Sequence, residues 1–76
     1  AAEIYEHIKQ MAFSHEFVSQ IHGFYLDEEK RAISFDVIVD FAAPDMEATF
    51  RAVCKQVRAA YPNYTLIITR DSDYSG

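Results

Sequence analysis

The spacing of hydrophobic positions along this chain switches between a helical and an extended period. Ile4, Ile8 and Met11 recur every three or four residues, which predicts a helix over residues 2–13. Asp45 can cap a second helix, which is expected to end at Tyr61-Pro62 because the residue before a proline disfavours helical geometry. The hydrophobic stripe of this second helix is formed by Met46, Phe50, Val53 and Val57.

Three segments have the pattern of strands. Residues 31–41 alternate most clearly, with Ile33, Phe35, Val37, Val39 and Phe41 on one side of the strand. Residues 18–27 precede them across the polar turn 27–30, which predicts a hairpin. Residues 64–70 form a last apolar strand, and the polar tail 71–76 is expected to fray.

The predicted order is therefore α-β-β-α-β in a single domain over residues 1–76, an α+β fold of the ferredoxin-like kind. The hairpin supplies an antiparallel pair of strands, and the strand-helix-strand unit supplies a parallel pair. We expect a three-stranded mixed sheet with both helices on one face. The other face would carry Ile38 with Ile67 or Tyr25, which favours a homodimer over a monomer.

Composition limits the possible functions. Seven Lys and Arg against twelve Asp and Glu give a net charge of −5 without any basic run, so nucleic-acid binding is not expected. The one cysteine, Cys54, cannot form an intrachain disulfide and lies in mid-helix without an organising third group. We expect no enzymatic activity.

The start of the sequence at Ala1-Ala2, with no initiator methionine, suggests a piece cut from a longer protein.

Candidate chemistry lies at the ends of the predicted sheet. His22 belongs to the first strand and Asp71 follows the last one, and the fold would bring the two positions toward each other. An imidazole and a carboxylate in proximity indicate metal binding rather than catalysis. For each residue taken alone, a structural role (a hydrogen-bonded strand histidine, a carboxylate in a turn) is the competing interpretation.

Three motifs, taken in their order along the chain, resemble the cytosolic C-terminal domain of cation diffusion facilitator transporters. The motifs are Val18-Ser19-Gln20-Ile21-His22, a helix ending at Tyr61-Pro62, and Leu66-Ile67-Ile68 followed by Asp71. The resemblance implies a metallochaperone-like fold, a homodimer, and a place on the cytoplasmic face of a membrane. Proton-coupled export of divalent ions such as zinc, manganese or iron would belong to a membrane domain outside this chain.

The same resemblance implies four metal ligands: His22, Asp36, Glu47 and Asp71. Glu47 stands where the family usually has histidine, and Thr69 replaces another usual ligand. One imidazole with three carboxylates is a harder donor set than zinc prefers, which shifts the expected preference toward manganese or ferrous iron.

Two other functions agree with the same sequence. One is a stand-alone domain that binds a small ligand or another protein, since this fold supports unrelated functions. The other is a dimerisation domain that has lost metal binding, which is suggested by the loss of histidines at two of the family's ligand positions and of any ligand at Thr69.

Overall fold

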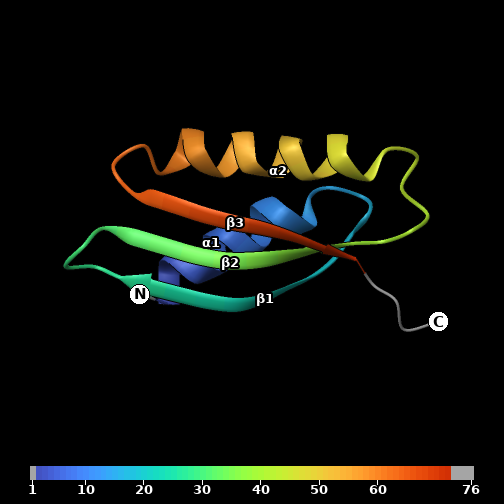
Figure 1. Ribbon diagram of the computed structural model, residues 1–76. Helices are drawn as coiled ribbons and strands as arrows, with labels where there is room; N and C mark the ends of the chain where they lie inside the picture. The colour runs from blue at the N-terminus through green and yellow to red at the C-terminus, as the bar shows by residue number, and fades with distance from the viewer. Residues whose placement is uncertain (1, 73–76) are drawn as a thin grey trace.

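The computed structural model describes residues 2–72 and arranges them in the predicted order (Figure 1). The elements are α1 (Ala2–Phe13), β1 (Val18–Asp27), β2 (Ala32–Val39), α2 (Met46–Ala60) and β3 (Thr65–Ser72). The fold class and element order predicted from the sequence are confirmed. Strand β2 is shorter than expected, and β3 extends through Asp71 and Ser72, which were predicted to fray. The rest of that predicted tail, residues 73–76, lies outside the described residues.

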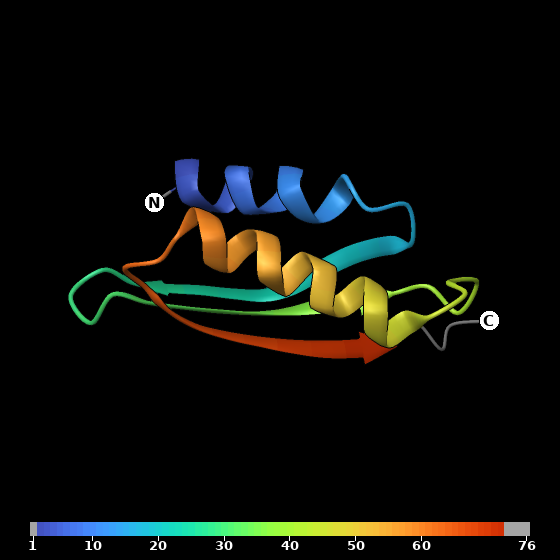
Figure 2. The same ribbon diagram turned by 90° about the horizontal axis from the view of Figure 1, so that it is seen from above.

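The sheet has the strand order β1-β2-β3, so β2 is its central strand. Strand β1 runs antiparallel to β2, and β3 runs parallel to it. Figure 2 shows both helices on one side of this sheet, while the other face has no helix over it. We call the uncovered side the open face.

The hydrophobic core lies between the sheet and the two helices. From β2 it receives Ile33, Phe35, Val37 and Val39, all of them buried. Helix α1 adds Ile8 and Ala12, and α2 adds Val53 and Val57. Because alternate residues of a strand point to opposite faces, Ser34, Asp36 and Ile38 are directed to the open face.

Side chains and backbone groups at the element ends fix where each helix stops and starts. The Asp45 carboxylate accepts a hydrogen bond from the Ala48 N–H (3.0 Å), which caps α2 as predicted. The Ser14 hydroxyl donates to the Met11 carbonyl (2.6 Å) at the end of α1. Each contact satisfies a backbone group that the helix itself leaves without a partner.

Strand β1 departs from regular pairing at two β-bulges, between Val18 and Gln20 and between His22 and Tyr25. Gly23 lies in the second bulge with a φ of 64°, a left-handed conformation that glycine adopts without steric cost. The extra residue lets Phe24 turn to the helix side, where its ring lies 4.8 Å from that of Tyr5. Tyr25 then returns to the open face opposite Ser34.

Replacing Gly23 with alanine is expected to lower the free energy of unfolding by about 1–2 kcal/mol, because an L-residue pays that cost in the left-handed region. A Cβ atom at this position would lie 3.5 Å from Asp36 Oδ2, an ordinary contact, so the penalty comes from the backbone. Urea denaturation should show a lower midpoint with an unchanged m-value.

The matched control is Gly23→Asn, since asparagine tolerates this conformation better than alanine despite its larger side chain. Gly23→Asn should therefore lower the free energy of unfolding by less than Gly23→Ala does. The opposite ranking would mean that crowding near Asp36, rather than backbone strain, makes glycine necessary.

Candidate metal centre

Two of the predicted ligands face each other across the middle of the sheet. His22 on β1 is directly opposite Asp36 on β2, and Asp36 is level with Thr69 on β3. Side chains directly opposite in an antiparallel pair have Cβ atoms about 4.5–5.5 Å apart. The imidazole and the carboxylate are thus close neighbours on the open face, in one row with the Thr69 hydroxyl.

A second row lies beside the first. Gln20 is paired with Ile38, and Ile38 is level with Asp71. Asp71 therefore shares the open face with His22 and Asp36, diagonally across from Asp36. The structure therefore places three of the four predicted ligands on the same face of the sheet.

Gln20 is a member of this site that the sequence reasoning missed. Its side-chain Oε1 accepts a hydrogen bond from His22 Nε2. The two residues are separated by one position on a strand, so their side chains point the same way, and this spacing was the available signal. The hydrogen bond holds the imidazole over the open face.

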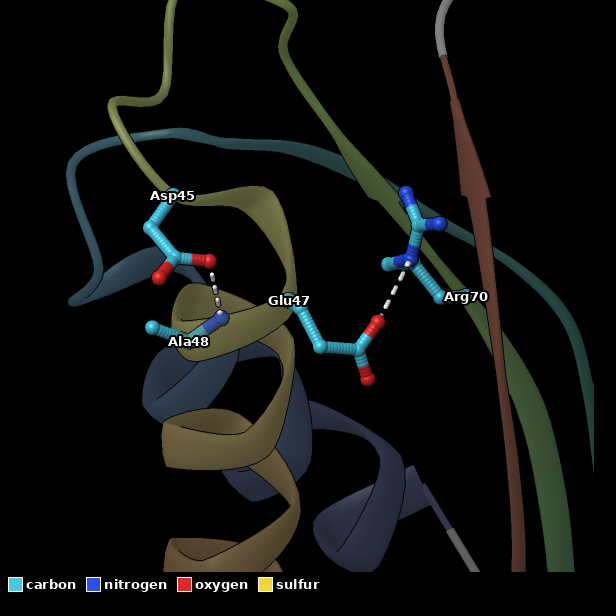
Figure 3. A network of polar contacts seen from close by, with 4 residues as sticks. All are labelled: Asp45, Glu47, Ala48 and Arg70. Atoms are coloured by element: carbon cyan, nitrogen blue, oxygen red, sulfur yellow. Dashed lines mark hydrogen bonds and ion pairs between the residues drawn. The ribbon is translucent and has the colours of Figure 1, made fainter.

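Glu47, the fourth predicted ligand, lies apart from the others in the single chain. It projects from the first turn of α2 toward Arg70 on β3, and its Oε2 is 3.5 Å from Arg70 Nε (Figure 3). Arg70 follows Thr69, so it points to the helix side of the sheet. The sheet therefore separates the Glu47 carboxylate from His22.

Across residues 2–72 no three His, Cys, Asp or Glu side chains come close enough together to hold a metal ion. One chain offers His22 and Asp36 as an adjacent pair, with Asp71 nearby. Completing a coordination shell would need oxygen donors from water, from Thr69 or Gln20, or from another copy of the chain. Compared with a histidine-rich site, such a shell, with one nitrogen and several oxygens, shifts the preference from zinc toward manganese or ferrous iron.

The other two histidines join the helices to each other. His7 Nδ1 hydrogen-bonds with the Tyr61 hydroxyl (2.7 Å), and His15 Nε2 donates to Gln56 Oε1 (2.8 Å). These contacts link α1 and the turn that follows it to α2 and to its C-cap residue Tyr61. Of the three histidines, His22 is the one on the open face.

Cys54 lies half-buried on α2, away from the open face. Burial raises the pKa of its thiol, and the nearby Glu47 charge acts in the same direction while Arg58 opposes both. A higher pKa leaves less of the thiolate, which is the reactive form.

A comparison with known protein families and with curated proteins finds no match for this chain. Within residues 2–72, neither helix is long and apolar enough to cross a membrane.

The Glu47–Arg70 ion pair is expected to contribute a coupling energy of only about 0.2–1 kcal/mol, because both side chains are partly exposed. Stability measurements on Glu47→Gln, Arg70→Gln and the double variant form the cycle that isolates this energy. The coupling should shrink in high salt because the charges are screened. A coupling that does not depend on salt would show that the two side chains interact by packing instead.

Proposed function

We propose that this chain is the dimerisation and regulatory metal-binding domain of a divalent metal-ion exporter of the cation diffusion facilitator kind. The observation that carries the proposal is the row formed by His22 and Asp36, with Asp71 on the same face. These are positions at which the family resemblance implies ligands. The domain would work on the cytoplasmic side of a membrane, and export itself would belong to a membrane domain outside this chain.

The proposed regulation follows from the charges on the open face. Asp36 and Asp71 place two carboxylates on the same face, and a second copy of this acidic chain would bring more negative charge against them at a cost in free energy. A bound cation removes this cost. If the ion binds one arrangement of two subunits more tightly than another, it shifts the population toward that arrangement and so changes transport.

On the open face, the ion would bind without Glu47 of the same chain as a ligand. That carboxylate is held by Arg70 on the helix side. The ligands that one chain lacks would be supplied by water or by a second copy. This donor set favours manganese or ferrous iron and predicts weaker zinc binding than in a histidine-rich site.

A second candidate function is a dimerisation domain that no longer binds metal. Two observations favour it: Thr69 occupies the row position where the resemblance implies a histidine, and Arg70 neutralises Glu47. The two candidates differ in whether the open-face carboxylates and His22 bind an ion.

Calorimetric titration of the metal-stripped domain with manganese, and then with zinc, distinguishes them. We expect micromolar binding of both ions, with manganese closer to zinc in affinity than at a histidine-rich site, and the loss of both in His22→Ala and Asp36→Asn. Binding should also weaken as the pH falls, because the ligands must give up protons to the metal.

Glu47→Gln serves as the matched control, since it removes a carboxylate on the other side of the sheet. Unchanged binding in this variant would confine the site to the open face. Lost binding would instead show that Glu47 of a second copy is a ligand. Absence of binding by either ion in the unaltered domain would refute the sensor role and leave the second candidate.

A further inference from the structure

The two edges of the sheet are built differently. Strand β1 is interrupted by two bulges, and bulges are a common means of preventing an edge from pairing with another chain. Strand β3 follows β2 in unbroken register from Thr65 to Ser72. It is an edge strand, and no further described strand continues the sheet beyond it. The regular edge is therefore the one suited to pairing.

The backbone geometry of β3 shows which of its N–H and C=O groups point away from β2. The Thr65 N–H donates to the Arg31 carbonyl (2.7 Å), on the side of β2. Because the N–H and C=O groups of alternate residues in a strand point to opposite sides, those of Leu66 and Ile68 are directed away from β2. These four groups form a short ladder ready for an antiparallel neighbour.

The stretch of sequence that contains this ladder carries no charged residue. Residues 59–69 contain neither an acidic nor a basic residue, although the chain as a whole has a net charge of −5. Ile67 is 61% exposed at the centre of the strand, and Leu66 and Ile68 are half-buried. A second copy of this acidic chain can approach here without the repulsion it would meet elsewhere.

We propose that two copies of the chain join edge to edge through β3, antiparallel and about a two-fold axis at Ile67. This register places Ile67 opposite Ile67, Leu66 opposite Ile68, and Thr65 opposite Thr69. The outward groups of Leu66 and Ile68 then bond to each other in both directions, and all five positions are uncharged. The next register along, centred on Ile68, would set Arg70 against Leu66 and Asp71 against Thr65.

The two three-stranded sheets would become one sheet of six strands. Its open faces would lie on the same side, so both His22–Asp36 rows would remain accessible to an ion. The inference rests on the dimerisation part of the proposed function and does not depend on metal binding.

Cysteine cross-linking tests the register. In a Cys54→Ala background without metal, Ile67→Cys should form a disulfide-linked dimer rapidly. Two residues directly opposite at a non-hydrogen-bonded position have Cα atoms about 4.5 Å apart, within the range that a disulfide spans. Thr69→Cys alone should not cross-link, although Thr69 is on the same strand and is also exposed. Adding Thr65→Cys to it should restore the link, because the register sets these two positions opposite each other.

Tyr25→Cys is the control for a dimer formed through the open face, since Tyr25 is 63% exposed there and belongs to the opposite edge strand. Cross-linking of Tyr25→Cys but not Ile67→Cys would overturn the edge pairing while keeping the homodimer. Equal cross-linking of Thr69→Cys and Ile67→Cys would overturn the register. A monomer in sedimentation equilibrium would overturn both the edge and the dimerisation part of the proposed function.

Discussion

Burial of β2 between the helices and its two neighbouring strands is the constraint on which the rest of the structure depends. Its residues Ile33, Val37 and Val39 are inaccessible to solvent, and both helices supply the apolar side chains that cover them. Both helices within residues 2–72 lie on the same face of the sheet (Figure 2). The other face must therefore either tolerate water or find a partner, and its mixture of polar and apolar side chains fits both conditions.

The alternation of strand residues then sorts the functional groups. Once Phe35 and Val37 point into the core, Asp36 must point away from it, and the pairing register brings His22 and Thr69 to the same level. By the same rule Arg70 turns to the helix side, where it meets Glu47. Core packing thus decides which polar residues gather on the open face, without any direct attraction among them.

The sequence predicted the elements well because their signals are local. The bounds of α1 and β1 agree with the predicted ranges, since helical spacing and the polar turn mark them clearly. The end of β3 was placed too early because it depends on a distant partner: Asp71 and Ser72 stay extended by pairing with Ile38 and Val39. The bulge at Gly23 and the His7–Tyr61 hydrogen bond were not predicted, because neither produces a periodic pattern of hydrophobic residues in the sequence.

The candidate site was predicted less completely because a motif gives positions along the chain but not the face to which each side chain points. His22, Asp36 and Asp71 do share a face, whereas Glu47 has its own cationic partner inside the chain. The sheet lies between Glu47 and an ion on the open face, and the ion pair of Glu47 with Arg70 adds only a small further cost. Glu47 and Thr69 therefore have a similar consequence: Glu47 is turned to the helix side and Thr69 offers only a hydroxyl, so an ion would depend mainly on His22 and the open-face carboxylates.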